Sequence, residues 1–454
     1  MLSPYEFYKN ADVKKRIREY CQGAVYVVGY GARANTSEKF QSVEKSRLNW
    51  ILENELDAFR SNWDDGSTLA VFDIEYFNLD YHAEIFVHPY ETYLKLEPVY
   101  KTVLDIYASF GIQPLVIMTG QGYHFSVKIP YSSPIHKKFE NASNICNSLA
   151  GKYNSISGRR KKKVPLNYGK AFESVGRLVE YVGHKMMKEL AGNDIPLVIT
   201  DVAVGSGKKG REAISLDLSM YADPIFMRDI RCPFSVYQKH KVKTWLYGQH
   251  IAKTVPYLIA IPRRQNDTLK DLIRIRTHYE AAAKLASNTS TVIPDASKGF
   301  KNLFAEYKTS KLSGFHKDFD NTVSHEPNEW SKTYDMFNLA SLPPCVKYPL
   351  ENPNDNLLKP TNIQLVTRVL MKLGWHPKHI AGLVRSKFER DYKWGSTWFK
   401  YDAQSRGNFY VRQFSGLIID GLDKEIDLNC VSHKQKGYCV KPVGCPFNLA
   451  NYKL

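Results

Sequence analysis

The segment of residues 69–77, with the sequence LAVFDIEYF, limits the possible folds more than any other part of the chain. Its β-branched and aromatic residues predict a β-strand. Because successive side chains of a strand point to opposite faces, Asp73 and Glu75 share one face, with Cβ atoms about 7 Å apart. Two carboxylates among apolar neighbours repel each other unless a cation lies between them. An exposed edge strand with two solvated acids is the alternative.

This pair of acids predicts a divalent-metal site. Mg²⁺ and Mn²⁺ prefer carboxylate oxygens, and paired ions can activate an attacking oxygen and neutralise a leaving phosphate. Asp217 lies on the polar face of a predicted strand over residues 213–221 and is the first candidate for a third ligand. Asp201 is its rival, although it shares strand parity with the apolar Leu197 and Ile199.

Residues 113–129 predict a hairpin, in which a turn with two glycines precedes a strand that carries His124 on its polar face. Gly120 and Gly122 would let backbone N–H groups approach phosphate oxygens, and the histidine could donate to the same anion. An ordinary hairpin with a histidine satisfied in the core is the alternative. Further along, four cations suit a triphosphate, unless they belong to a solvated basic loop: Arg228, Arg231, Lys239 and Lys241.

Charge also points to a phosphate-rich partner. The chain of 454 residues has 63 lysines and arginines against 46 aspartates and glutamates, which gives a formal net charge of +17. Such an excess favours nucleic acid, and a basic composition without functional meaning is the alternative. The basic run of residues 159–163 would bind a template if it faces the cleft, and is otherwise a solvated loop. The basic and aromatic stretch of residues 393–412 also has two interpretations. Its aromatic and basic side chains could contact a template, or they could pack in the core.

No uncharged apolar run reaches about 18 residues, so we expect no membrane partner. The polar N-terminal sequence argues against a secretory signal. These two features predict a cytoplasmic protein, and the basic charge predicts association with the nucleoid.

Taken in order, these elements resemble the catalytic subunit of the archaeo-eukaryotic primase superfamily. The matching pieces are the hhhDhE strand with Asp73 and Glu75, the hairpin sequence TGQGYH, the strand-borne Asp217, and an R-x-P-x-S stretch that begins at Arg231. The resemblance implies that Asp73, Glu75 and Asp217 bind the catalytic Mg²⁺ or Mn²⁺ ions. Together with Lys239, the hairpin and the R-x-P-x-S stretch supply the candidate nucleotide-binding residues Thr119, Gly120, Gly122, His124, Arg231 and Ser235.

Four of the seven cysteines, Cys345, Cys430, Cys439 and Cys445, fall in the last quarter of the chain. In a cytosolic protein such a group indicates a metal site more often than disulfides. The spacing leaves open a four-cysteine cluster, a Zn²⁺ site built from His433 and the last three cysteines, or incidental buried thiols. The segments LPPC, LGW, CVSHKQKGYC and GCPFNLANY resemble the iron-sulfur domain of the primase large subunit, which implies a 4Fe-4S cluster on the four cysteines.

The resemblance implies an α+β chain with three parts. Residues 1–262 would form a primase-polymerase catalytic core with an RRM-like mixed sheet, and residues 341–454 a mostly helical iron-sulfur domain. Residues 265–285 contain good helix formers, and the polar stretch of about 285–340 lacks sustained periodicity, so residues 263–340 are predicted to be a helix plus a flexible linker.

The implied activity is that of a DNA primase, which makes short primers on a single-stranded DNA template by two-metal nucleotidyl transfer from an NTP or dNTP. A replicative helicase is a candidate partner. The alternatives are a primase-polymerase that extends primers in lesion bypass or mobile-element replication, and a non-catalytic single-strand-binding replication initiator.

Overall fold

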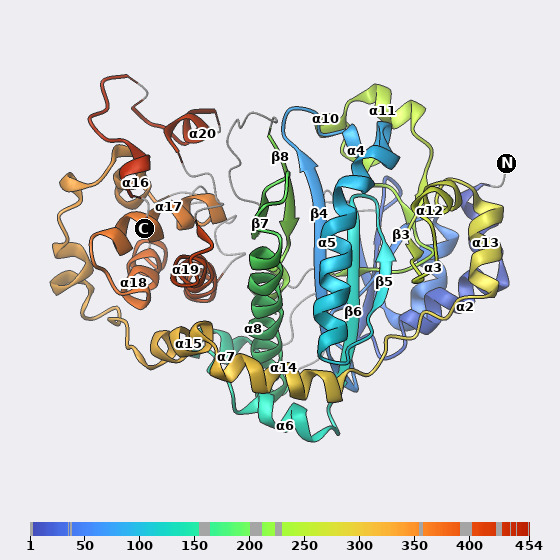
Figure 1. Cartoon of the computed structure of the whole chain (residues 1–454), viewed down its shortest axis with the longest axis horizontal. Coiled ribbons are helices and arrows are strands. Elements are labelled where there is room, and N and C mark those ends of the chain that lie inside the picture. The colour runs from blue at the N-terminus through green and yellow to red at the C-terminus, as the bar shows by residue number, and fades with distance from the viewer. Residues whose placement is uncertain are drawn as a thin grey trace.

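The computed structural model describes residues 3–34, 36, 39–153, 164–199, 211–222, 229–353, 357–390, 402–423, 429–435, 437–441, 443–452 and 454. A part built on β-sheets and covered by helices carries the N-terminus, and a helical part at the other end carries the C-terminus (Figure 1). The predicted α+β class is confirmed, because a mixed six-stranded sheet is followed by a helical C-terminal part.

The larger sheet has the strand order β12-β5-β6-β4-β8-β7. Its strands are β4 (Ser67–Asn78), β5 (Leu115–Met118), β6 (Gly122–Pro130), β7 (Leu197–Ile199), β8 (Glu212–Leu216) and β12 (Ile261–Pro262). With α5 (Pro89–Ser109) and α8 (Leu166–Glu189), the chain follows the β-α-β-β-α-β plan β4-α5-β5-β6-α8-β8. The neighbours β5, β6, β4 and β8 are all antiparallel, which confirms the expected RRM-like sheet.

Helices α5 and α8 lie across one face of this sheet (Figure 1). Phe72 and Ile74 of β4 are fully buried, and α8 packs against β4 at Gly183, next to the Phe72 ring. Because side chains alternate along a strand, Asp73 and Glu75 point to the opposite face. The alternation that buries the apolar residues thus directs both acids away from the covering helices.

A smaller antiparallel sheet faces those acids across the interior. Its order is β2-β1-β3-β9, and its strands are β1 (Tyr26–Tyr30), β2 (Phe40–Glu44), β3 (Asp57–Arg60) and β9 (Ile230–Arg231). A two-stranded sheet joins β10 (Val236–Tyr237) to β11 (Leu258–Ile259). The helices around these sheets are α1 (Pro4–Lys9), α2 (Ala11–Tyr20), α3 (Leu48–Glu53), α4 (Glu84–Val87), α6 (Pro134–Glu140), α7 (Asn147–Tyr153), α9 (Lys239–Val242), α10 (Thr244–Tyr247) and α11 (Gln249–Thr254).

The single helix predicted over residues 265–285 is two helices, α12 (Leu269–Ile275) and α13 (Tyr279–Ser287). The carbonyl of Arg276 accepts a hydrogen bond from the N–H of Ile259, 2.8 Å away, and the Thr277 hydroxyl bonds the carbonyl of Arg274. Hydrogen bonds to a strand and to a side chain therefore end the first helix where residue propensity alone would continue it.

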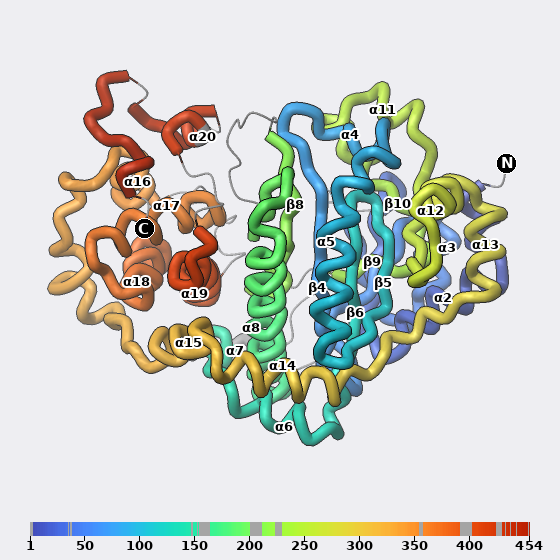
Figure 2. The backbone as a smooth tube through the Cα atoms, in the orientation of Figure 1, coloured from blue at the N-terminus to red at the C-terminus, as the bar shows by residue number. Residues whose placement is uncertain are grey.

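The prediction of a flexible linker up to residue 340 is wrong, because this stretch contains α14 (Ser297–Thr309) and α15 (Lys311–Asn321). Phe300, Leu303 and Tyr307 form a buried stripe on α14 at helical spacing, and Phe315 and Phe319 do so on α15. The abundant polar residues between them conceal this pattern in the sequence. In Figure 2 the two helices run from beneath the sheet to the C-terminal helices.

The C-terminal part consists of α16 (Pro344–Glu351), α17 (Pro360–Lys372), α18 (Pro377–Phe388), α19 (Ala403–Ile419) and α20 (Cys430–Gln435). Its buried apolar residues belong to the same continuous cluster as those of the large sheet. Ion pairs reinforce this contact: Arg177 of α8 lies 2.7 Å from Asp320 of α15, and Arg412 of α19 pairs with Glu173 of α8. The helical part is therefore packed directly against the sheet-bearing part.

Candidate active site

Of the three acids predicted to form one site, Asp73 and Glu75 lie on β4, and Asp217 directly follows the adjacent strand β8. Asp73 of β4 is paired with His124 of β6, and the backbone N–H of Asp217 donates to the carbonyl of Asp73 over 2.9 Å. The strand expected over residues 213–221 ends at Leu216, and Asp217 follows it directly because its N–H continues the bonding to β4. Asp73 and Asp217 are 8% and 5% exposed, and Glu75 is half-buried.

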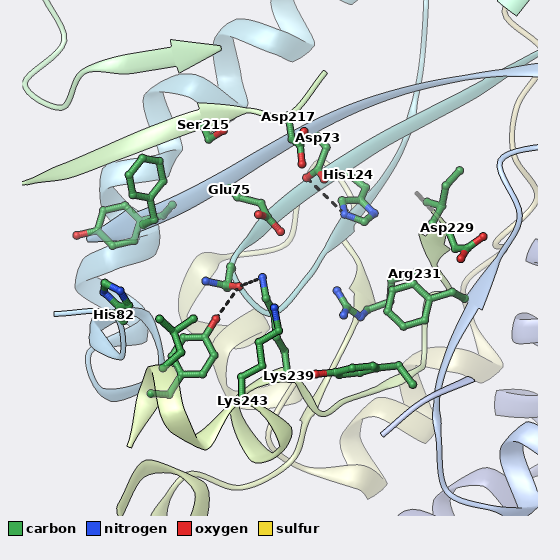
Figure 3. Close-up of a pocket in the computed structure, with 18 of the residues that line it drawn as sticks. Asp73, Glu75, His82, His124, Ser215, Asp217, Asp229, Arg231, Lys239 and Lys243 are labelled. Atoms are coloured by element: carbon green, nitrogen blue, oxygen red, sulfur yellow. Dashed lines mark hydrogen bonds and ion pairs between the residues drawn. The ribbon is translucent and has the colours of Figure 1, made fainter. Parts of the chain in front are cut away.

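These acids line a cavity of about 610 Å³ between the two larger sheets. Figure 3 shows Asp73, Asp217 and His124 close together, with Glu75 on the same side. Arg231, Lys239 and Lys243 lie opposite them and line the same cavity. One space therefore has Asp73, Glu75 and Asp217 on one wall and three cations on the other, where Asp229, next to β9, also lines it.

His124 contacts the carboxylate of Asp73, with Nε2 3.4 Å from Oδ1. The pKa of His124 is lowered to about 4, chiefly by burial and also by the nearby Arg231, while Glu75 opposes the shift. The imidazole is therefore neutral at pH 7, and its contact with Asp73 is not an ion pair. Its Nδ1 has no hydrogen-bond partner among the residues that the structure describes. A neutral imidazole can donate one hydrogen bond to an anion without adding a positive charge.

Arg231, on the opposite wall, is held from behind by Asp57. Its Nη2 lies 3.0 Å from one Asp57 oxygen, and its Nε lies 3.1 Å from both oxygens. Phe59 and Tyr237 place their rings 4.6 and 4.4 Å from the guanidinium carbon. Burial disfavours the charged form, but Asp57 outweighs it, and the pKa of Arg231 is raised. Arg231 is thus a fixed, permanently charged group at the cavity.

Lys239 and Lys243 carry further positive charge into the cavity from the start and the end of the short α9 region. The Nζ of Lys239 lies 2.6 Å from Oε1 of Gln121, which also accepts from Tyr237 over 3.1 Å. Gln121 comes from the turn between β5 and β6, so the hairpin positions a lysine. Among the residues that the structure describes, Lys239 Nζ contacts this amide, and no ion pair with a carboxylate is formed.

Four predicted nucleotide-binding residues do not line the cavity: Thr119, Gly120, Gly122 and Ser235. A Cβ on Gly120 would lie 2.1 Å from the Tyr237 ring, and one on Gly122 would lie 1.8 Å from the carbonyl oxygen of Ile74. The two glycines therefore permit close packing of the hairpin rather than a phosphate cradle. Ser235 is fully buried and donates to Asp57 over 2.7 Å, so it supports Arg231 from behind.

The sequence patterns missed four residues that line the cavity, Lys243 and the aromatic residues Tyr30, Phe40 and Phe59. They also missed Asp57, which does not line the cavity. The alternation of Tyr26, Val28 and Tyr30 in YVVGY is a usable strand signal. Nothing in that signal shows which face meets the acids, because β9, which brings Arg231 into this sheet, pairs with β3 from more than 100 positions away.

Three of the four clustered cysteines lie close enough to Cys345 to affect it, although 84 residues separate Cys345 from Cys430. Burial raises the pKa of Cys345 to about 12, and the neighbouring Cys439, Cys430 and Cys445 add to the shift. His433 is buried, and its backbone carbonyl accepts from the N–H of Cys439 over 3.2 Å. No disulfide joins any of the seven cysteines, all of which lie in the described ranges.

Within the described ranges, no group of three or more histidine, cysteine, aspartate or glutamate side chains is arranged to hold a metal ion. This applies to the carboxylates of the cavity and to the clustered cysteines. No helix in the described part of the chain is long and apolar enough to cross a membrane.

Several sequence predictions fall outside the described residues: Asp201, Arg228, the basic run 159–163 and residues 393–401. Of the rest of the basic and aromatic stretch, Phe409, Tyr410 and Arg412 are buried in α19, which agrees with core packing.

No family model matches the chain, and no curated protein matches it. A search of solved structures finds the polymerase domain of Ligase D from Mycobacterium tuberculosis, solved in complex with DNA. That chain is 14% identical, the match covers 63% of this chain and 88% of the other, and the TM-score is 0.33. At this level the likeness does not say what the present chain does.

Proposed function

We propose that the chain is a nucleotidyltransferase that acts as a DNA primase. The observation that carries the proposal is the cavity in which Asp73, Glu75 and Asp217 face Arg231 and Lys239. Nucleotidyl transfer needs a group that binds the triphosphate and acids that hold divalent ions at the reacting phosphate.

The acids of the cavity have the donor chemistry that Mg²⁺ or Mn²⁺ requires. Mg²⁺ is usually bound by one or two carboxylates together with substrate phosphates and water, so a complete protein cage is not needed. Asp73 and Asp217, joined through their backbones, would hold the first ion, and Glu75 would hold a second with the triphosphate. When bound, the ions would activate the attacking 3′-hydroxyl and neutralise charge on the phosphates.

The side chains opposite the acids would bind the nucleotide. Arg231 offers a guanidinium of fixed orientation, which suits phosphate oxygens. Lys239 adds a mobile point charge on the same side. His124, neutral at pH 7, would donate a hydrogen bond to a phosphate oxygen. These contacts would orient the α-phosphate toward the primer end and stabilise the pyrophosphate that leaves.

The substrates that fit this chemistry are an NTP or dNTP and a single-stranded DNA template, in accordance with the net charge of +17. Extension of existing primers by a primase-polymerase would use the same cavity. Primer synthesis on a circular single-stranded template without any 3′-end separates the two: products appear from a primase and are absent from an enzyme that only extends. A cytoplasmic, nucleoid-associated location and a helicase partner would follow from the primase role.

We also propose that Cys345, Cys430, Cys439 and Cys445 hold a 4Fe-4S cluster. Cysteine thiolates are the usual ligands of such clusters, and the shift of Cys345 responds to the other three cysteines. A Zn²⁺ ion on His433, Cys430, Cys439 and Cys445 is the second candidate, because His433 is buried next to Cys439.

Incorporation of labelled nucleotides by the full chain tests the enzymatic proposal. The double variant Asp73→Ala with Glu75→Ala is expected to lose incorporation and to retain DNA binding. Incorporation at the wild-type rate in this variant would refute the proposal.

A further inference from the structure

The smaller sheet presents a row of three aromatic side chains to the cavity. Phe40 of β2, Tyr30 of β1 and Phe59 of β3 all line it. Tyr30 and Phe40 are directly opposed in the β1–β2 ladder, and their ring centroids are 4.5 Å apart. Phe40 and Phe59 are 6.2 Å apart, so the three rings form a continuous surface, which we call the aromatic row.

The aromatic row begins at a residue of the basic wall. Phe59 and Arg231 are paired across the β3–β9 ladder, and the guanidinium lies 4.6 Å from the Phe59 ring centroid. Neighbouring strands are about 4.8 Å apart, so the rings extend from Arg231 along the sheet in single strand steps. A molecule whose phosphates contact Arg231 therefore has flat apolar surface immediately beside it.

Two observations indicate that the row is built for a ligand. The hydroxyl of Tyr30 has no hydrogen-bond partner among the described residues, although Tyr30 is only 3% exposed. A buried tyrosine hydroxyl normally finds a partner. In addition, Tyr30 and Phe59 belong to a small apolar cluster that is separate from the main core, and Phe40 is only half-buried against it. The rings therefore lie apart from the main core, on the wall of the cavity.

We propose that the aromatic row is a nucleobase-binding wall, which stacks the base of the nucleotide whose triphosphate lies at Arg231 and Lys239. This inference rests on the proposed function. Every nucleobase has a π-face, so stacking on the row would be tolerant of base identity. The Tyr30 hydroxyl would donate a hydrogen bond to an oxygen or nitrogen of the bound nucleoside. Binding at the cavity would then depend on the nucleoside as well as on the phosphates.

Titration calorimetry of the full chain in Mg²⁺ separates the two contributions. ATP and dATP carry a base, whereas inorganic tripolyphosphate offers phosphates alone. We expect Phe40→Leu to weaken ATP and dATP binding by roughly 5- to 100-fold, the range for loss of one base-stacking contact, with little effect on tripolyphosphate. Tyr30→Phe, which keeps the ring, should weaken both nucleotides by about 2- to 10-fold.

Tyr26→Leu is the matched control, because Tyr26 belongs to the same strand, face and cluster but does not line the cavity. Its nucleotide affinity should equal that of the wild type. Two results would overturn the base-binding wall and leave the triphosphate site intact. One is an equal loss of nucleotide affinity in Tyr26→Leu and Phe40→Leu. The other is unchanged nucleotide affinity in both Phe40→Leu and Tyr30→Phe. Failure of the wild type to bind both ATP and tripolyphosphate would overturn the proposed function as well.

Discussion

Arg231 and Asp57 form a buried ion pair behind the wall of the cavity, with Nη2 3.0 Å from the carboxylate and both groups less than a tenth exposed. Ser235 donates to Asp57, and its hydroxyl accepts from the N–H of Ala58. The carboxylate thus fixes the direction of the Arg231 guanidinium, which faces the cavity. Asp57 is a positioning residue in this account, since it does not line the cavity itself.

Replacing Asp57 with Asn should therefore affect nucleotide binding more than turnover. The change leaves the Arg231 charge buried without its counter-charge, and we expect a loss of about 3 kcal/mol or more in the free energy of unfolding. With Arg231 no longer fixed, KM for the nucleotide should rise about tenfold, as for a lost charged hydrogen bond, while kcat changes less. Steady-state kinetics on the folded variant, together with urea denaturation, measure both effects.

Ser235→Ala serves as the milder comparison, because it removes one hydrogen bond from Asp57 and no charge. It should lower the free energy of unfolding by about 1 kcal/mol and shift KM in the same direction. A normal KM in Asp57→Asn, in spite of reduced stability, would show that Asp57 is structural only.

His240 gives the protein a dependence of stability on pH. It is fully buried on α9, and burial lowers its pKa to about 4, with a further decrease from Lys241 and opposition from the carbonyl of Pro256. Because the unfolded chain binds the proton more tightly, this residue removes stability as pH falls from about 6.5 to about 4. The contribution is about 3 kcal/mol for a shift of this size.

Urea denaturation at pH 7 and at pH 4.5 measures this effect. His240→Gln, whose amide can still donate to Pro256, should show a smaller loss of stability between the two values than the wild type. The pKa values of His124 and His316 are also lowered to about 4, and both histidines are present in the wild type and in His240→Gln, so they contribute equally to the two losses. An identical loss in His240→Gln and wild type would mean that His240 titrates normally.

The two candidates for the C-terminal cysteines differ in metal content. For a 4Fe-4S cluster, protein purified without oxygen should be brown and contain about four iron atoms, and Cys345→Ser should lose the colour. His433→Ala should then keep it. The Zn²⁺ site is favoured instead if the protein is colourless and contains one zinc ion. That zinc ion should then be lost in His433→Ala and retained in Cys345→Ser. Metal analysis of the two variants therefore decides between these sites.

The sequence predicted the parts of the site that depend on local patterns. Alternation along β4 was sufficient to place Asp73 and Glu75 on one face, and that along β6 to place His124. Alternation over residues 213–221 also made Asp217 the first candidate for a third ligand, and its N–H bonds the carbonyl of Asp73. These residues could be predicted because successive side chains of a β-strand alternate between its two faces, so the sequence alone shows which side chains share a face.

The contacts behind the cavity could not be predicted in this way. Ser235 was expected at the nucleotide, but it bonds Asp57, a residue 178 positions away. Gly120 and Gly122 were expected at phosphates, but the rings and backbone that they approach come from other strands. Helices α14 and α15 were missed because their apolar stripes become evident only against the surfaces that they cover. Each error concerns a partner distant in sequence, about which local propensity contains no information.

The central claim is that acids on β4 and beside β8 hold divalent ions for nucleotidyl transfer. Its most direct test is Mg²⁺-dependent nucleotide incorporation on a single-stranded template by Asp73→Asn, Asp217→Asn and the control Asp80→Asn. Asp80 follows the same strand but is exposed and pairs with Arg211. We predict a loss of at least about 100-fold for each cavity variant, with Asp80→Asn near wild type. Incorporation by Asp73→Asn and Asp217→Asn at the rate of Asp80→Asn would contradict the claim.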